Sequence, residues 1–291
     1  MIGVMGASGN VGSRVANRLL RDGQDIRVFG RTASRLQSLG AGGAEVVVGD
    51  AIDPQALHAL FKDAGAALVV LPDNVGDPNF ASNRSAMSRE ITVALREEGV
   101  GHVVFASSLG ADRDRGVGQI AGLHELEELL FGLQGANVLS LRQAWHMENL
   151  LAAVPMIRDQ KLNGSAMAGD LAFPMIATFD VAERAAGHLL RRDFSGHSVA
   201  TLLGPEDRTM EEATRALGDA LGIPDLPYVQ FPPEGVKAAL EGAGMSEEFA
   251  SLLVESQLAL NDGTITPGME RSSENTTPTR LEDFLEEALS R

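Results

Sequence analysis

The sequence predicts an α/β protein in which a doubly wound parallel sheet is followed by a smaller α/β lobe. Through the first 142 residues, short runs rich in β-branched residues alternate with amphipathic stretches. A strand followed by a helix, repeated about five times along the chain, is typical of a parallel sheet with helices on both faces. A glycine-rich turn between the first expected strand and the first expected helix favours the same class.

The expected strands of this sheet are short apolar runs that end in turn residues. They cover residues 1–6, 25–30, 44–50, 66–72, 102–108 and 137–142. The helices between them are expected to begin near Val11, Ala33, Pro54, Asn79 and Gln119. In the fourth of these helices Met87, Ile91 and Leu95 recur every four residues, which places them on one helical face.

The second half of the chain has a looser rhythm. A helix is expected at 146–158, a loop with short strands at 162–175, helices at 180–192 and 209–222, and strands at 197–204 and 226–232. Thr209 and Glu212 have the spacing of a capping box, and residues 233–291 are expected to be mostly helical and acidic. We therefore predict a dinucleotide-binding domain at 1–145 and a smaller substrate-side lobe at 146–291, with parts of the lobe returning to the sheet.

The composition excludes several functional classes. The chain has 24 Lys and Arg against 40 Asp and Glu, a net charge of −16, whereas a nucleic-acid surface needs a concentrated basic face. The absence of cysteine excludes disulfides, a thiolate nucleophile and cysteine metal sites. No apolar run reaches the length of a membrane span, and residue 1 already belongs to an expected strand. We therefore expect a cytoplasmic protein that binds neither nucleic acid nor membrane and has no signal peptide.

Three glycines at a spacing of three residues predict a dinucleotide site. Such a turn must be tight, must let the backbone approach a pyrophosphate and must let the helix pack on the strand. The amides at the helix start then point at the phosphates. A glycine-rich turn without a ligand is the alternative, but the strand before and the helix after favour binding. The segment expected to hold the cofactor consists of Gly6, Ala7, Ser8, Gly9, Asn10, Val11 and Gly12.

The end of the second strand predicts which dinucleotide binds. In NAD-selective sites an acidic residue about 20 residues beyond the glycines holds the ribose 2′-hydroxyl. Gly30 stands there instead, followed by Arg31, Thr32 and Arg35. A glycine leaves room for a 2′-phosphate and a guanidinium can bind it bidentately, although a solvated surface arginine is the alternative. We therefore expect NADPH to be preferred over NADH.

Two further strand ends face the same crevice, since ligands in such sheets lie outside the carboxyl ends of the strands. Asp50 and Ala51 are placed for the adenine, and Leu71 and Pro72 for the ribose and pyrophosphate. Asp53, just before a proline, is expected to cap a helix rather than to contact the ligand.

Six segments together resemble the NmrA-like branch of the atypical short-chain dehydrogenases/reductases. They are "GASGNVG", "RTASRL", "VVVGDAID", "FASSLGAD", "QAWHMENLL" and "NTTPTRLEDF". The resemblance spans nearly the whole chain, and "HMENLL" and "TPTRLEDF" are its more specific pieces. It implies a Rossmann-type NADP-binding fold. Members include NADPH-dependent quinone and azo-dye reductases, enzymes resembling iminium reductases, and redox-sensing regulators that bind dinucleotide without turnover.

The catalytic pair of orthodox short-chain dehydrogenases, Tyr-x-x-x-Lys, is missing. The one tyrosine, Tyr228, lies in the second half with no lysine four residues later. In the NmrA-like branch a lysine usually stands early in the helix after the "SS" strand, and the resemblance implies that His124 fills its place. A histidine there can hydrogen-bond the ribose or pass a proton near neutral pH. Alternatively, His124 pairs with Glu128 one turn later.

The remaining candidates follow the fifth and sixth strands. Ser107 and Ser108 end the fifth strand nearest the nicotinamide, where a hydroxyl could hold the carboxamide or a substrate oxygen, or simply end the strand. The substrate pocket is expected to include Trp145, His146, Met147 and Asn149. Trp145 could form an apolar wall over the nicotinamide or belong to the core. Asn149 could face the cofactor or cap a loop.

These observations predict an NADPH-dependent reductase of a small apolar acceptor such as a quinone, enone or imine. The rival is a non-catalytic protein that senses the NADPH to NADP ratio. A sugar-nucleotide epimerase is disfavoured because it needs the missing tyrosine and lysine. No metal site is expected, since "HELEE" lacks a second histidine. The oligomeric state is open, and a homodimer through helices is compatible with the sequence.

Overall fold

A computed structural model describes residues 1–265, 268 and 270–290 of the chain. Its centre is a seven-stranded sheet in the order β10-β6-β5-β4-β1-β2-β3, in which every pair of neighbours is parallel. The strands are β1 (Ile2–Val4), β2 (Ile26–Gly30), β3 (Glu45–Val48), β4 (Ala66–Val69), β5 (His102–Ser108), β6 (Asn137–Gln143) and β10 (His197–Leu202). All six strands expected in the first half are confirmed.

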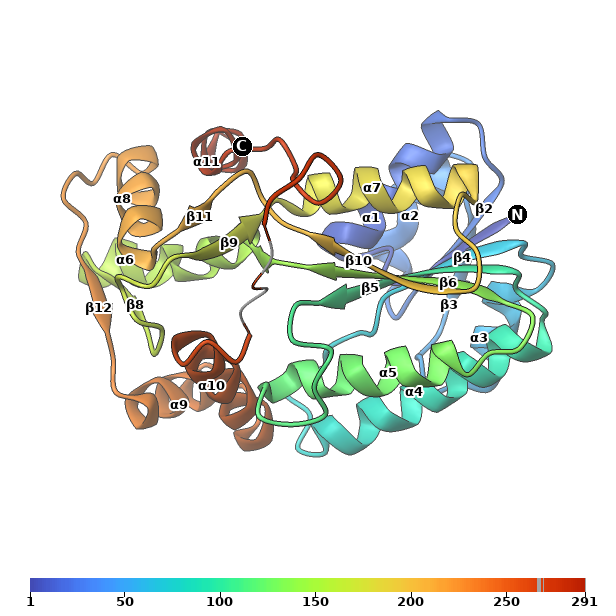
Figure 1. The fold of residues 1–291 in the computed structure, drawn as a ribbon, viewed down its shortest axis with the longest axis horizontal. Helices are drawn as coiled ribbons and strands as arrows, with labels where there is room; N and C mark the ends of the chain where they lie inside the picture. Colours follow the sequence, from blue (N-terminus) through green and yellow to red (C-terminus); the bar gives the residue numbers. More distant parts are fainter. Residues whose placement is uncertain (266–267, 269, 291) are drawn as a thin grey trace.

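Helices cover both faces of this sheet, which explains why its central strands are continuous apolar runs. They are α1 (Asn10–Arg21), α2 (Ala33–Ala41), α3 (Pro54–Phe61), α4 (Phe80–Glu97), α5 (Ala121–Phe131) and α7 (Thr178–Arg191). One buried cluster joins α1, α2 and α7 to the sheet, and the other joins α3, α4 and α5 to it. Figure 1 shows α7 and α1 on one side and α4 and α5 on the other. The predicted face of α4 is confirmed, because Met87, Ile91 and Leu95 are buried in the second cluster.

A smaller region lies beyond the carboxyl ends of the strands (Figure 1). Its strands form two small sheets, ordered β11-β9-β7 and β12-β8. Its strands are β7 (Trp145–His146), β8 (Asn163–Ser165), β9 (Phe173–Ile176), β11 (Asp207–Arg208) and β12 (Tyr228–Gln230). Its helices are α6 (Val154–Gln160), α8 (Met210–Ala220), α9 (Pro233–Gly242), α10 (Glu247–Asn261) and α11 (Leu281–Leu289). A third buried cluster joins α6, α8 and α11 to β9, and Trp145 of β7, Tyr228 of β12 and Leu260 of α10 pack against it.

Two predicted helix caps are confirmed. Asp53 accepts the Gln55 amide at 2.9 Å and opens α3. Thr209 and Glu212 each bond the backbone amide of the other, at 3.1 and 3.0 Å, which is a capping box at the start of α8. Both side chains satisfy amides that the first turn of a helix leaves unpaired.

The helix expected at 146–158 is wrong in its first half. Trp145 and His146 instead form β7, which pairs in parallel with Met175 and Ile176 of β9. A 3₁₀ segment, Met147–Ala153, follows, and the α-helix begins only at Val154. The pairing with β9 joins residues 30 positions apart in the sequence, so helical periodicity alone misplaced the start of the helix.

The chain returns to the large sheet after this smaller region has begun. β10 pairs with β6 along six residues, from His197 opposite Val138 to Leu202 opposite Gln143. α7 packs beside α1, and Arg18 of α1 is ion-paired with Glu183 of α7. The boundary at residue 145 stays a prediction. Among the described residues, no helix combines the length and the apolar character that a membrane crossing requires.

Candidate active site

The glycine turn (residues 5–9) joins β1 to α1 at the carboxyl edge of the sheet. Gly6 has a φ of +64°, which residues with a side chain rarely adopt, and its carbonyl accepts the Gly9 amide at 2.9 Å. A Cβ at Gly12 would lie 2.3 Å from the Gly6 carbonyl oxygen. Helix and turn therefore touch backbone to backbone, and the turn requires both glycines.

The start of α1 offers unpaired backbone donors. The amides of Asn10, Val11 and Gly12 have no hydrogen-bond acceptor among the residues that the structure describes. The N-cap residue, Gly9, supplies no side-chain oxygen, and no acidic residue stands in the first turn. Free amides at the positive end of a helix dipole suit a phosphate group. The residues present therefore fit the pyrophosphate of a dinucleotide.

Ala7 and Ser8 complete the predicted phosphate-binding segment, and they differ in exposure to solvent. Ala7 is buried, and its amide donates to the Phe29 carbonyl at 3.3 Å. Ser8 is exposed, and its hydroxyl oxygen would lie 3.5 Å from a Cβ placed on Gly30. Ser8 thus brings a hydroxyl group to the junction between the turn and the end of β2.

The end of β2 carries the residues predicted to select the dinucleotide. A Cβ at Gly30 would meet its neighbours at 3.5 Å or more, so packing does not demand a glycine here. Arg31, Thr32 and Arg35 are exposed. Arg31 donates to the Asp73 backbone carbonyl at 3.5 Å, and neither arginine is ion-paired with a carboxylate in the described part of the chain. Arg31 and Arg35 thus offer two available guanidinium groups next to a glycine that leaves space, an arrangement chemically suited to a 2′-phosphate.

The ends of β3 and β4 offer fewer free groups. Asp50 is exposed, and its carboxylate accepts the Ile52 amide at 3.2 Å. Ala51 and Leu71 are buried, whereas Pro72 is half-buried. These positions can line a ligand mainly through backbone and apolar surface.

The ends of β5 and β6 carry a buried network that no sequence motif predicted. Ser107 of β5 and Arg142 of β6 are neighbours in the sheet register, and Glu127 of α5 bonds to both. The Ser107 hydroxyl donates to a Glu127 oxygen at 2.5 Å, and Arg142 donates to the carboxylate through Nη2 at 2.6 Å and through Nε at 3.2 Å. Glu127 is 1% exposed and Ser107 is 0% exposed.

This network limits what Ser107 can do. Its hydroxyl is enclosed and already donates to Glu127, so in this arrangement it has no proton free for a ligand. Ser108, the next residue, is half-buried and is the serine of the predicted pair that keeps accessible surface. One sequence signal could have revealed Glu127, because it stands four residues after Leu123 and three before Leu130 on the apolar face of α5.

His124 is anchored to the loop that follows β5. Its Nδ1 lies 3.0 Å from the Ala111 carbonyl oxygen. A carbonyl only accepts, so Nδ1 carries a proton, and Nε2 of the neutral ring remains an acceptor. The ring is half-buried. The alternative partner, Glu128, forms no ion pair with it, both residues lying in the described part of the chain.

The predicted substrate wall is divided between the third buried cluster and the surface. Trp145 is half-buried and meets the Phe173 ring edge to face at a centroid distance of 5.8 Å. Met147 is buried in the same cluster, whereas Asn149 is exposed. Core packing thus accounts for Met147 and part of Trp145, and the accessible part of the indole is what a ligand could touch.

His146 has an enclosed polar atom. Its Nε2 is shielded from solvent and has no hydrogen-bond partner among the described residues. Burial lowers the pKa of His146, and the nearby carboxylate of Glu148 opposes this shift. Glu148 accepts the Thr178 amide at 3.1 Å at the start of α7 and lies 3.9 Å from Arg14 of α1. The segment 145–149 is therefore tied to the helix that follows the glycine turn.

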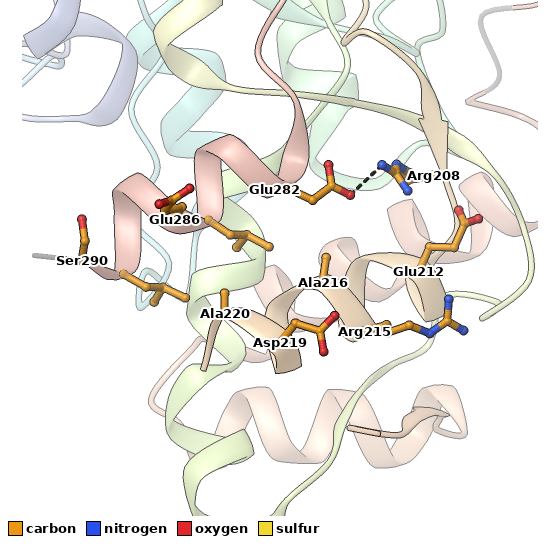
Figure 2. A pocket seen from close by; sticks show the side chains of 11 residues that line it. Arg208, Glu212, Arg215, Ala216, Asp219, Ala220, Glu282, Glu286 and Ser290 are labelled. Atoms are coloured by element: carbon orange, nitrogen blue, oxygen red, sulfur yellow. Dashed lines mark hydrogen bonds and ion pairs between the residues drawn. The ribbon is translucent and has the colours of Figure 1, made fainter. Parts of the chain in front are cut away.

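Two cavities lie away from the glycine turn. A groove of about 600 Å³ separates α8 from α11, with alanine and leucine side chains between charged rims (Figure 2). Arg208 and Glu282 are ion-paired at 2.7 Å beside it. A second cavity, of about 510 Å³, lies between α4, α5 and α10 and includes His124. Neither lining contains a residue of the glycine turn.

Within the described residues, no group of three or more His, Cys, Asp or Glu side chains is arranged to hold a metal ion. The candidate site therefore consists of backbone amides, guanidinium groups and the side chains at the ends of β5 and β6.

Comparisons with known proteins agree with this geometry. A family model described as NAD(P)H-binding matches residues 6–130. The NAD(P)H azoreductase of Xenophilus azovorans is 26% identical over 263 residues, 88% of this chain and 85% of that protein. The NmrA-like family domain-containing oxidoreductase himF of Aspergillus japonicus is 30% identical over 161 residues, 52% of this chain and 48% of that protein.

A solved structure extends the likeness to the whole fold. The NADPH-dependent quinone oxidoreductase of Escherichia coli, complexed with NADPH, superposes with a TM-score of 0.81 over 99% of both chains at 24% identity. At this identity the match shows a shared fold, including the region beyond the carboxyl ends of the sheet.

Proposed function

We propose that the chain is a member of the NAD(P)H-binding, NmrA-like family of atypical short-chain dehydrogenases/reductases, and that it is an NADPH-dependent reductase of a small apolar acceptor. The acceptor class is a quinone, an enone or an imine. The unpaired amides at the start of α1 are the single observation that supports cofactor binding most directly, because three of them can donate hydrogen bonds to an anionic group.

NADPH is the expected dinucleotide. The start of α1 holds the pyrophosphate, and Arg31 and Arg35 bind the 2′-phosphate in the space left by Gly30. Gly30→Asp restores the acid that would hold a ribose 2′-hydroxyl and repel a phosphate. We expect this variant to lose about tenfold or more of its affinity for NADPH relative to NADH, measured by titrating cofactor fluorescence. An unchanged ratio would contradict the assigned selectivity.

When bound, the nicotinamide supplies a hydride, and reduction of a neutral acceptor also consumes one proton. Tyr228 is not placed to give that proton, since its hydroxyl bonds to Ser165 and to the Met167 carbonyl in the smaller region. His124 is the candidate donor. Its Nδ1 is fixed by Ala111, so Nε2 is the atom that can take a proton from solvent and release it to the acceptor. Trp145 offers apolar surface to a flat substrate.

The alternative function is a sensor that binds NADP(H) without turnover. One observation favours it specifically: the Ser107 hydroxyl is enclosed and donates to Glu127, so it is not available to hold a substrate oxygen. A sensor predicts that binding to a partner protein changes with the redox state of the cofactor.

The first experiment follows NADPH absorbance with a panel of quinones, enones and imines. We compare the wild type with His124→Ala and with His58→Ala, a matched control on α3 whose ring bonds to Glu98 at 2.8 Å. Turnover lost only in His124→Ala assigns the proton donor, with a loss on the order of 100-fold. Equal turnover in all three removes His124 from the mechanism. NADPH binding without turnover on any acceptor favours the sensor.

A further inference from the structure

The Ser107–Glu127–Arg142 network joins three elements at the edge of the sheet where the nicotinamide is expected. Ser107 ends β5, Arg142 ends β6, and Glu127 belongs to α5, which lies below both strands in Figure 1. The single carboxylate receives hydrogen bonds from both strands. We call this arrangement of Glu127, Arg142 and Ser107 the edge clamp.

The edge clamp is built on an ion pair whose carboxylate is buried, since Glu127 is 1% exposed and Arg142 is 21% exposed. Burial alone would lower the pKa of Arg142, but hydrogen bonds and charge from Glu127 raise it above its usual value. Arg142 contacts the carboxylate in a forked geometry through Nη2 and Nε. Forked guanidinium–carboxylate contacts fix orientation as well as distance. The clamp therefore restrains both the rotation of α5 and its separation from the strand ends.

Each member of the clamp has a neighbour in the proposed site. His124 stands three residues before Glu127 on the same helix, Ser108 follows Ser107, and Trp145 lies three residues after Arg142. A shift of α5 against β5 and β6 would move the proton donor relative to the apolar wall. Misplacing a reacting group by about 1 Å can cost about 100-fold in rate.

We propose that Glu127 and Arg142 are positioning residues, which hold His124 in a fixed position relative to the ends of β5 and β6 while hydride is transferred. This role rests on the proposed reductase function. It differs from a purely structural role, because a structural pair can be exchanged for apolar residues of similar volume without loss of fold.

The decisive variant replaces both partners, Glu127→Met with Arg142→Met, so that no buried charge is left unpaired. The matched control is Arg27→Met with Glu45→Met, an arginine–carboxylate pair at the opposite edge of the sheet with an Nη2–Oε2 distance of 2.9 Å. Both proteins are compared with the wild type in unfolding midpoint, NADPH affinity, kcat, KM and the isotope effect with NADPH deuterated at C4.

For the edge-clamp variant we expect kcat to fall about 10- to 100-fold, with NADPH affinity within about twofold and a larger isotope effect. Amide hydrogen exchange should become faster at residues 118–124 while the unfolding midpoint is kept. The control should keep wild-type kcat and exchange at these residues. Wild-type kcat in a folded edge-clamp variant overturns the positioning role, and so does an equal fall in the control.

Failure of the reductase function is distinguishable from failure of the clamp. A wild type that binds NADPH and reduces no acceptor overturns the proposed function before any variant is made. Hydrogen exchange then still tests whether the edge clamp restrains α5. Unchanged exchange at residues 118–124 in the folded double variant overturns that claim. If the double variant does not fold, Glu127→Gln, which keeps the shape and removes the charge, undergoes the same measurements.

Discussion

Two arginine–carboxylate pairs lie at opposite ends of the strands of the large sheet, one at the amino ends (the amino edge) and one at the carboxyl ends (the carboxyl edge). The two pairs are built in opposite ways. At the amino edge the guanidinium of Arg27 is 9% exposed, while its partner Glu45 is 55% exposed. At the carboxyl edge Glu127 is 1% exposed and Arg142 is 21% exposed. Arg27 also donates to two backbone carbonyls, so the amino-edge pair satisfies the chain itself. The carboxyl-edge pair instead ties a helix to two strands beside the candidate site.

This contrast suggests that substitutions at the amino edge change stability, whereas substitutions at the carboxyl edge change ligand binding and turnover. In open α/β sheets, ligands bind outside the carboxyl ends of the strands. The following substitutions test the division, each with a counterpart at the other edge or in the same pair.

The largest effect is expected from Gly12→Ala at the carboxyl edge. The new Cβ would lie 2.3 Å from the Gly6 carbonyl oxygen and 2.7 Å from that of Met5, so the turn must open. We expect NADPH affinity to fall beyond detection in a fluorescence titration and the free energy of unfolding to fall by about 1–3 kcal/mol.

Gly101→Ala is the matched substitution at the amino edge of β5. A Cβ there would have its nearest neighbour, the Gly65 carbonyl oxygen, at 3.8 Å. NADPH affinity should stay at the wild-type value. Loss of affinity in both variants would mean that the sheet edges do not differ in the way described.

A smaller effect, on stability alone, is expected from Arg27→Met. The substitution leaves the carbonyls of Leu60 and Lys62 without the donor that now lies at 3.1 and 2.8 Å. We expect the free energy of unfolding to fall by about 1–3 kcal/mol in urea titrations. The kcat and the NADPH affinity of the folded variant should be unchanged, and a selective loss of kcat would break the comparison.

The smallest effect is expected from Glu45→Gln, and it depends on pH. The hydrogen bond from Arg27 lowers the pKa of Glu45 below its ordinary value of 4.5. Because the unfolded chain then binds the proton first as the pH falls, this stabilisation is present above pH 4.5 and is lost below it. Solvent screens the exposed carboxylate, so the contribution is about 0.5 kcal/mol or less.

Urea unfolding from pH 3 to pH 7 measures this difference. The free energy of unfolding of the wild type should be slightly larger than that of Glu45→Gln at neutral pH, and the two free energies should converge in acid. A gap that widens as the pH falls would contradict the sign.

The large sheet was predictable because its strands are short apolar runs buried on both faces, and each ends in turn residues. The same burial hid the choice between Ser107 and Ser108, since a strand covered on both faces shows no alternation that says which side chain points to α5. The glycine turn and the arginines after β2 were predictable because they are local motifs. The apolar face of α5 was a signal for a buried Glu127, but its pairing with Arg142 was not predictable, because that pairing depends on the register of β5 with β6 and on the rotation of α5.

The prediction of the helix at the start of the smaller region was wrong for a related reason. Residues 146–158 have a helical pattern, yet Trp145 and His146 pair with β9 from a later part of the chain. A parallel pairing between distant segments competes with the local helical preference, and here it prevails at His146, the first residue of the expected helix. Such competition cannot be read from a window of sequence.

β10 has a consequence for the order in which the protein is made. As the chain leaves the ribosome, β6 is complete at Gln143, but its outer edge is covered only when His197–Leu202 has followed. During that interval of more than 50 residues, β6 presents unpaired amides and carbonyls to neighbouring nascent chains. Translation through α6 to α7 is therefore the period when this protein most needs a chaperone, and a product stopped before β10 would be prone to aggregate.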